Sequence, residues 1–495
     1  MCKLSEEAKV SGQLAPSLIA YKNCDIIDVN PGNGLWSSTL HGHLKPRTHL
    51  LLEPEESYIS SLRPLLDKPG STYRHVPYSG IEWSSYEKII NDGLLPNQEP
   101  LEEHDPGYNS TNNTLLFIAN LAHHPRRKFG DFKSISQLMI HQLTTAVRTR
   151  TIFQRYGLVR MLVWTINAEK NTILPRTVAR RGKSTIQAET TCDKIQEVAG
   201  AEGGLGRKRR DMALDIASSK RVAMLMEKDG RERATDGATQ EGHPKEKQAS
   251  GETEGGMDLS GRLWWEELKG LEEGYRNKEF TRFVTEECRQ WGKTRMLTKD
   301  YQRLVHLRTF ASSLKKKNTL VDQLLLKEED REAAEESVMS MEQEQRDEEL
   351  AKLAESYKEG LSTSSESMQD NFALASDERK ALTMDPPLLM WDRRTQEPII
   401  AKPEEFQPQP KQSILRGLNT LAPGAAAYIT PLAPSLSDPK RGGRRNLDQL
   451  RVRMLTAEMI EEIVVAWENW PFRPSMGELL MKMGIDRATV RERSL

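Results

Sequence analysis

A glycine-containing turn, Asp28–Gly34 (DVNPGNG), is the segment of this sequence best suited to binding a nucleotide. It follows an apolar run, so it would bring backbone N–H groups and the start of the next helix towards a ligand. Glu53 ends the next apolar run, where an acidic side chain can accept hydrogen bonds from both hydroxyls of a ribose. The alternative is a Pro-Gly turn beside a surface glutamate. We expect a cofactor site at Asp28, Gly32, Gly34 and Glu53.

A second candidate segment, Asn120–Pro125 (NLAHHP), ends another apolar run. The carboxyl ends of the strands line the ligand crevice of an open α/β sheet. Asn120 and the backbone carbonyl of Leu121 would there accept hydrogen bonds from the exocyclic amine of a base. The alternative is that Asn120 caps the strand and the two histidines form a solvated turn. A metal site is not expected, because adjacent histidines point in different directions and no third ligand is apparent.

Basic residues dominate the stretch from residue 120 to residue 183, which holds thirteen Lys or Arg and two Asp or Glu. Such a balance suits a polyanion, and nearby aromatic rings can stack on bases. The alternative is a solvated basic surface on an ordinary enzyme. The candidate nucleic-acid-binding residues are Arg126, Arg127, Lys128, Phe129, Arg148, Arg150, Arg155, Tyr156, Arg180 and Arg181.

Alternating strands and helices must position these residues. Apolar runs predict strands at 25–30, 49–53, 73–76, 114–121 and 158–166. Helical patterns separate them at 35–44, 55–66 and 134–153. Continuous apolar runs are typical of parallel strands covered on both faces, so the sequence predicts an α/β fold with a mostly parallel sheet.

Changes in composition divide the chain into five segments. They are a nucleotide-binding domain at 1–200, a low-complexity linker with a helical pattern at 201–257, a charged helical region at 258–361, a proline-rich extended region at 362–455 and short helices at 456–495. Within the linker, residues 229–256 have almost no apolar side chains, so we expect them to be disordered.

The overall composition of the 495 residues excludes several classes of protein. The net charge of −1 conceals the basic stretch and an acidic one at 327–357. The four cysteines include no C-x-x-C pair, which argues against a disulfide framework or a zinc site. No apolar run approaches the roughly 20 residues that span a membrane. The N-terminus lacks the apolar region of a secretory signal and contains two glutamates, which is poor for a transit peptide.

Three segments together resemble the ribosomal RNA adenine dimethyltransferase family, and most of all its fungal mitochondrial branch, the mitochondrial transcription factor B proteins. The segments are DIIDVNPGNGLWSSTLHGHLKPRTHLLLEPEESY, TLLFIANLAHHPRRK and YGLVRMLVW, within about residues 14–200. The resemblance implies a Rossmann-like, class I S-adenosylmethionine methyltransferase domain followed by a small helical domain. The later part of the chain resembles only the long extensions of filamentous-fungal members.

The family's motifs can be placed on this sequence residue by residue. Its acidic residue and glycine turn fall on Asp28, Gly32 and Gly34, and its ribose-binding acid falls on Glu53. Its target-base motif, typically Asn-Leu-Pro-Tyr, falls on the four residues from Asn120 to His123.

The departures from these motifs bear on activity. Ala122 and His123 replace the proline and the aromatic residue of the target-base motif. Asn30 or Pro31 replaces the first glycine of the turn, and nothing before residue 25 matches the family's Gln-Asn-Phe-Leu-type segment. This pattern resembles members that kept the fold for binding nucleic acid and polymerase and lost methyl transfer.

The resemblance therefore implies a mitochondrial transcription initiation factor that binds promoter DNA and mitochondrial RNA polymerase. The alternative is an active S-adenosylmethionine-dependent ribosomal RNA adenine N6-dimethyltransferase, with Asn120 and Leu121 holding the target base. A third interpretation is a scaffold that keeps a methyltransferase fold without activity. We expect weak or vestigial binding of S-adenosylmethionine, no metal, no membrane contact, mitochondrial localisation and a monomer.

Overall fold

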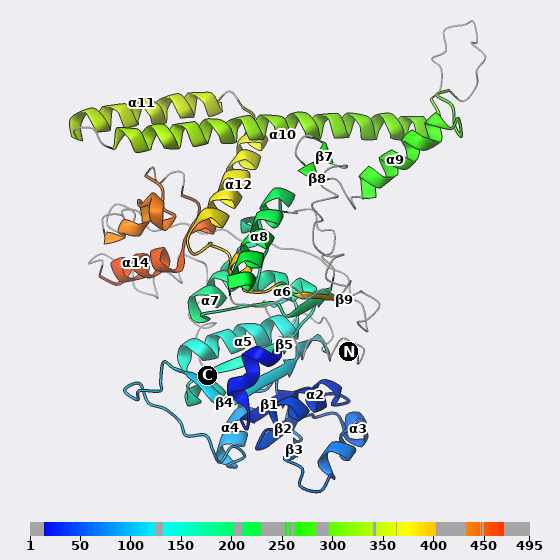
Figure 1. The fold of residues 1–495 in the computed structure, drawn as a ribbon, viewed down its shortest axis with the longest axis vertical. Coiled ribbons are helices and arrows are strands. Elements are labelled where there is room, and N and C mark those ends of the chain that lie inside the picture. The colour runs from blue at the N-terminus through cyan, green and yellow to red at the C-terminus, as the bar shows by residue number, and fades with distance from the viewer. Residues whose placement is uncertain are drawn as a thin grey trace, which may run out of the picture.

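The computed structural model describes most of the chain (Figure 1). The described residues are 14–123, 132–201, 210–228, 253–254, 257–258, 263–283, 297–339, 343–362, 364–401, 432–445, 447 and 450–469. Several predicted features lie outside them, namely Arg126, Arg127, Lys128 and Phe129, most of the low-complexity linker and the last 26 residues.

A parallel five-stranded sheet forms the centre of the N-terminal domain, in the order β3-β2-β1-β4-β5. The strands are β1 (Asp25–Val29), β2 (Thr48–Leu52), β3 (Tyr73–Val76), β4 (Thr111–Asn120) and β5 (Leu158–Trp164). All five residues of β1 and of β2 are buried, as the continuous apolar runs predicted. The predicted α/β class is confirmed, and the sheet is compatible with a Rossmann-like fold.

Helices cover both faces of this sheet, because side chains alternate along each strand and both sets are apolar. On one face, Ile26 and Leu116 pack against Leu40 of α2. On the other face, Phe117 packs with residues of α4 and α5. The helices of this domain are α2 (Leu35–Leu44), α3 (Glu56–Leu66), α4 (Trp83–Asn91) and α5 (Ile135–Thr149).

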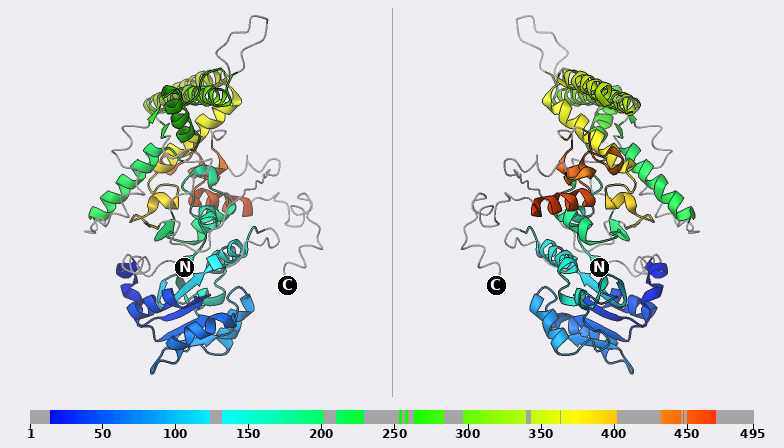
Figure 2. Two further views of the ribbon diagram at one scale, coloured as in Figure 1. Left: turned by 90° about the vertical axis from the view of Figure 1, so that its right-hand side faces the viewer. Right: turned by 90° about the vertical axis from the view of Figure 1, so that its left-hand side faces the viewer.

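The rest of the chain is mainly helical, and it lies on one side of the sheet domain (Figure 2). Its longer helices are α6 (Asn167–Ile173), α7 (Lys183–Thr191), α8 (Met212–Lys228), α9 (Leu263–Arg276), α10 (Lys299–Val338), α11 (Gln343–Ser362), α12 (Glu366–Thr383) and α14 (Ala457–Glu468). Two short strand pairs complete the described elements: β6 (Ala199–Ala201) with β9 (Ile399–Ala401), parallel, and β7 (Thr253–Glu254) with β8 (Met257–Asp258), antiparallel. No helix in the described part of the chain is long and apolar enough to cross a membrane.

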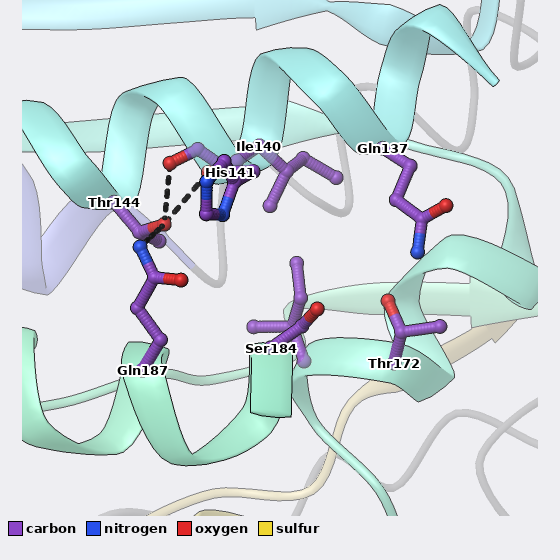
Figure 3. Close-up of a pocket in the computed structure, with 8 residues that line it drawn as sticks. Gln137, Ile140, His141, Thr144, Thr172, Ser184 and Gln187 are labelled. Carbon is purple, nitrogen blue, oxygen red and sulfur yellow. Dashed lines mark hydrogen bonds between the residues drawn. The ribbon is translucent and has the colours of Figure 1, made fainter. Parts of the chain in front are cut away.

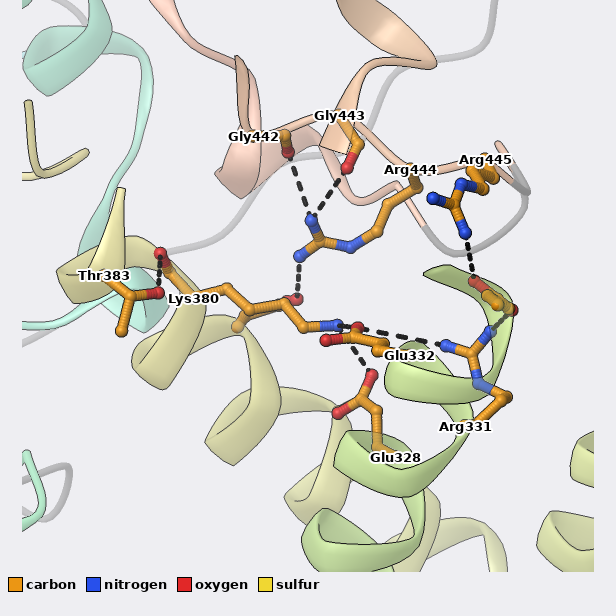
Figure 4. A network of polar contacts seen from close by, with 12 residues as sticks. Glu328, Arg331, Glu332, Lys380, Thr383, Gly442, Gly443, Arg444 and Arg445 are labelled. Atoms are coloured by element: carbon orange, nitrogen blue, oxygen red, sulfur yellow. Dashed lines mark hydrogen bonds and ion pairs between the residues drawn. The ribbon is translucent and has the colours of Figure 1, made fainter. Parts of the chain in front are cut away.

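A charged network fixes α10 and α12 to the C-terminal segment (Figure 4). Lys380 of α12 donates to Glu328 of α10 at 2.8 Å and also contacts Glu332. Arg445 pairs with Glu335 of α10 at 3.3 Å, and Arg444 lies 3.9 Å from the carboxylate of Asp377 of α12. These contacts join residues that lie from about fifty to more than a hundred positions apart in the sequence, so they define how the helical region assembles.

Candidate nucleotide and nucleic-acid sites

The glycine turn lies at the carboxyl edge of the sheet, between β1 and α2. Asn30, Gly32 and Gly34 all have positive φ angles, of 55°, 58° and 71°. Gly34 is the N-cap of α2, and a Cβ there would lie 2.9 Å from both Leu62 and Leu65 of α3. The tight path therefore requires glycine at position 34, for backbone conformation and for space.

Glu53 follows β2 at the same edge, so the structure brings the acid and the turn together. Its Oε2 accepts a hydrogen bond from the Gly32 N–H at 3.1 Å, and its Oε1 accepts one from the Glu55 N–H at 3.1 Å. The residue is only 3% exposed. The carboxylate thus already stabilises the turn, and a ribose would have to uncover it first.

Asp28 is buried on the opposite side of β1 from the core formed by Ile27 and Val29. Its Oδ2 accepts a hydrogen bond from the Ser37 hydroxyl at 2.5 Å and lies 3.3 Å from Nε2 of His49. Nδ1 of His49 lies 3.1 Å from Nδ1 of His41. The chain of contacts ties β1, β2 and α2 together, and sequence reasoning missed it because nothing in the local pattern links these histidines to Asp28.

His41 is neutral in this chain of contacts. Burial, with His49 and Lys68 as smaller causes, lowers the pKa of His41 to about 4. The two facing Nδ1 atoms therefore share one hydrogen, with one nitrogen as donor and the other as acceptor. The ring of His41 also stacks on Tyr73, with centroids 3.9 Å apart.

Asn120 ends β4 beside Trp164 of β5, and the backbone carbonyls of Asn120 and Leu121 both accept internal hydrogen bonds. The Asn120 carbonyl accepts from Nδ2 of Asn30 at 3.3 Å. The Leu121 carbonyl accepts from the Ser136 hydroxyl at 2.6 Å, within the buried interior. A target base would therefore compete with the Ser136 hydroxyl for the Leu121 carbonyl oxygen that was expected to hold it.

Side chains alternate between the two faces of the sheet along β4, so the Asn120 side chain lies on the same face as those of Leu116 and Ile118. Two indole rings lie on this face. Trp36, in the first turn of α2, meets Trp164 edge to face, with ring centroids 5.3 Å apart. Both rings pack on one apolar cluster, to which Ala199 of β6 and Ile399 of β9 also contribute. Part of this cover comes from a strand almost 280 residues beyond Asn120 in the sequence.

These observations test whether the described residues fit S-adenosylmethionine. The ribose acceptor Glu53 is buried and bonded to the turn, and Asp28 is occupied by Ser37 and His49. As they stand, the residues do not fit the cofactor, because a ligand would have to displace internal hydrogen bonds. In the described part of the chain, no three His, Cys, Asp or Glu side chains gather as metal ligands.

The predicted basic residues are distributed over separate places. Arg148 and Arg155 are exposed, and Arg150 donates to Asn109 at 2.8 Å. Arg148 lies in the last turn of α5 and the other two follow it, and this helix starts near the carboxyl edge and runs back along the sheet for 15 residues, about 22 Å. They therefore lie at the edge opposite Asn120. The basic stretch does not form one continuous face around the crevice.

The remaining three candidate residues, Arg180, Arg181 and Tyr156, differ in how exposed their side chains are. Arg180 is exposed at the end of a short 3-10 helix. Arg181 is 7% exposed, pairs with Glu189 at 2.7 Å and donates to the carbonyl of Arg453 at 2.9 Å. Tyr156 is 5% exposed and belongs to the apolar core of the sheet domain. The structure thus removes Arg181 and Tyr156 from the candidate nucleic-acid surface, because both are internal.

A small polar cavity lies between α5 and α7 (Figure 3). Its volume of about 10 Å³ has room for one water molecule. On its wall, Gln187 donates to Thr144 and Thr145 at 3.5 and 2.9 Å. The cavity is a packing gap between helices rather than a site for a nucleotide.

The fold and the carboxyl edge together define an α/β domain that is compatible with a Rossmann-like fold and whose candidate ribose acceptor is buried against the glycine turn. No protein-family profile matches the chain. The chain is 24% identical over 157 residues to Mitochondrial transcription factor 1 of Lachancea kluyveri. The alignment covers 30% of this chain and 40% of that protein, so this chain matches less than half the length of its relative.

Proposed function

We propose that this protein is a mitochondrial transcription initiation factor that keeps a methyltransferase-like domain for binding nucleic acid and polymerase. The similarity to a protein named as a mitochondrial transcription factor supports a role in transcription and a mitochondrial location. The burial and internal hydrogen bonds of Glu53 and Asp28 at the carboxyl edge support a binding role rather than methyl transfer. Of these, the observation that carries the proposal is Glu53, whose carboxylate is buried and bonded to the turn.

The alternative is a ribosomal RNA adenine N6-dimethyltransferase. It is favoured by the retained order of strand, glycine turn, helix, strand and Glu53. It is opposed by the hydrogen bond that the Leu121 carbonyl already accepts from Ser136, and by the two indoles on the face of the sheet that carries the Asn120 side chain. The two functions differ in their nucleic-acid substrate, since initiation needs opened DNA and the methyltransferase needs structured RNA.

Exposed cations in two separate places supply the surface for phosphates. Arg148 and Arg155 lie at one edge of the sheet, and Arg180 ends a 3-10 helix that contacts α12. The sequence adds Arg126, Arg127 and Lys128 directly after the β4 motif. Phosphate contacts of this kind bind without strong sequence preference, so promoter selection in this proposal depends on the polymerase as well.

The experiment measures binding of the full chain to bubble DNA, paired duplex and structured RNA at several salt concentrations. We expect preference for the bubble and a linear fall of log affinity with log salt, about −0.7 per single-strand contact. Replacing Arg126, Arg127 and Lys128 with Ala should weaken binding to all three nucleic acids and make the slope shallower. Phe129→Ala should cost about 1–3 kcal/mol on single strands if its ring stacks on a base.

Arg63→Ala is the matched control, because Arg63 is an exposed arginine on α3, outside the basic stretch. It should leave affinity and slope unchanged. A preference for structured RNA together with methylation of adenine would overturn the proposal in favour of the methyltransferase. Equal binding by the triple variant and the parent, with the same slope, would leave the basic stretch as an ordinary solvated surface.

A further inference from the structure

The long helix α10 lies at the end of the molecule farthest from the sheet (Figures 1 and 2). Its 40 residues extend about 60 Å. One side of it is buried: Leu304 and Leu307 pack with residues of α9, and Val321 and Leu325 pack with residues of α11 and α12. Among the described residues, these two clusters hold the helix along one side.

The opposite side of α10 is an exposed stripe, which we call the outer stripe. Residues three or four apart share a helix face, and they place Leu320, Gln323 and Leu326 together on this side. Leu320 and Leu326 are 49% and 58% exposed. The exposed members of the stripe are Val305, Thr309, Ser312, Lys316, Thr319, Leu320, Gln323, Leu326, Lys327 and Asp330.

The outer stripe differs from the rest of α10 in its charge. Sixteen of the 40 residues at 299–338 are charged. Only three of the ten stripe residues are charged, namely Lys316, Lys327 and Asp330. An exposed helix face of leucines and small polar residues on a heavily charged helix is typical of a helix–helix contact. The stripe therefore has the composition of an interface.

We propose that a second copy of this chain docks on the outer stripe, with the two α10 helices antiparallel and the two-fold axis at Gln323. In that register Leu320 faces Leu326 of the second copy, and Lys316 faces Asp330 of the second copy. Ser312 meets Ala334 of the second copy, so small residues meet small ones. A two-fold axis repeats every such contact, so each charged pair occurs twice.

The distribution of charge along α10 supports this orientation. Residues 299–317 carry six Lys or Arg and one Asp, whereas residues 318–338 carry two Lys or Arg and seven Asp or Glu. An antiparallel pair places each basic half beside the acidic half of the other copy, and a parallel pair would place like charges together. Nucleic acid is a poorer occupant, because the acidic half would repel it. The monomer expected from sequence does not account for the stripe.

The test is sedimentation equilibrium of the full chain, with circular dichroism to confirm that each variant is folded. We expect a dimer for the parent and a dissociation constant raised at least about tenfold by Leu320→Asp or Leu326→Asp, which bury a carboxylate in the contact. Val464→Asp is the matched control, because Val464 is an exposed apolar residue on α14, outside the outer stripe. A monomeric parent, or folded Leu variants that dimerise like the parent, would overturn the proposal.

Two further variants test the register itself. Lys316→Asp should weaken the dimer by placing two acidic side chains together, and adding Asp330→Lys to the same chain should restore it. Gln323→Cys should form an intermolecular disulfide across the axis, whereas Val305→Cys should not. Failure of the second charge change to rescue the first would exclude this register. A dimer lost only on addition of nucleic acid would instead identify nucleic acid as the occupant.

Discussion

At the scale of residues, the carboxyl edge shows how acids placed for a ligand can become structural. Glu53 holds the glycine turn and Asp28 holds Ser37 and His49, so both acceptors are used within the domain. A buried carboxylate with amide or hydroxyl donors is stable, and removing those donors costs free energy. A ribose that binds Glu53 would have to replace these hydrogen bonds, and the free energy lost with them would lower its affinity.

We therefore expect S-adenosylmethionine to bind more weakly than the low micromolar range, because Glu53 must first be uncovered. Isothermal titration of the cofactor into the full chain measures this directly. Glu53→Gln, which keeps the size of the side chain, should change the affinity little. Tight binding by the parent with a loss of tenfold or more in Glu53→Gln would show that the crevice opens and would revive the methyltransferase.

His41 gives a second prediction at this scale. Its folded pKa of about 4 lies below the ordinary 6.5, so the unfolded chain binds more protons in that interval. Stability contributed by the neutral ring is complete above pH 6.5 and is lost as the pH falls towards 4. Urea unfolding midpoints should fall over this interval for the parent and fall less for His41→Gln. The exposed His104→Gln serves as the control and should behave like the parent.

At the scale of elements, ion pairs between distant segments fix the helices of the C-terminal region. Although burial favours the neutral acid, Lys380 holds the pKa of Glu328 below its usual value. Arg379, one residue earlier on α12, pairs with Glu329 at 3.1 Å in a much more exposed position. The two neighbouring ion pairs therefore contribute differently to the free energy of unfolding, because solvent screens the exposed Arg379–Glu329 pair more than the buried Lys380–Glu328 pair.

We expect Lys380→Met to destabilise the helical region by about 1–3 kcal/mol at neutral pH, because Glu328 is left buried without its cation. Arg379→Met should cost less than about 1 kcal/mol. The deficit of Lys380→Met should shrink below pH 4.5, since protonation removes the parent's ion pair and relieves the variant's unpaired carboxylate. Denaturant unfolding followed by circular dichroism compares them, and equal losses in both variants would show that burial of Glu328 has no effect.

At the scale of the whole molecule, the N-terminal domain and the later chain share contacts. Ile399 of β9 packs on the same cluster as Trp36 and Trp164, and β9 pairs with β6. The C-terminal region therefore contributes to the cover over the carboxyl edge. By contrast, the composition of the linker at 231–250 offers three alanines and no larger apolar side chain to bury.

Deleting residues 231–250 should leave the thermal midpoint almost unchanged, because such a composition cannot offset chain entropy by burying apolar surface. Ile399→Asp provides the contrast, since it places a charge in the contact between β9 and the sheet domain. It should lower the midpoint by several degrees. Scanning calorimetry measures both, and a large fall for the deletion would mean that the linker packs against the rest of the protein.

Local patterns in the sequence determined the strands, the turn and the order of elements. Apolar runs specify buried strands, and Gly34 has a conformation and a setting that admit no side chain. They also placed Glu53, Asn120 and the turn at one edge, because parallel strands end together. The helix α4 was missed, and its short, partly polar segment explains why.

Only the tertiary structure decided what these residues contact. The bond from Gly32 to Glu53, the contact of Trp36 with Trp164, and the cover by Ile399 join residues that are far apart in sequence. The positions of the cations also depend on the tertiary structure. Arg148 and Arg181 belong to one basic stretch of the sequence, but Arg148 lies at the edge of the sheet opposite Asn120 and Arg181 is buried. Composition is read along the chain, but burial and pairing depend on the path of the backbone, so charge could be predicted and its exposure could not.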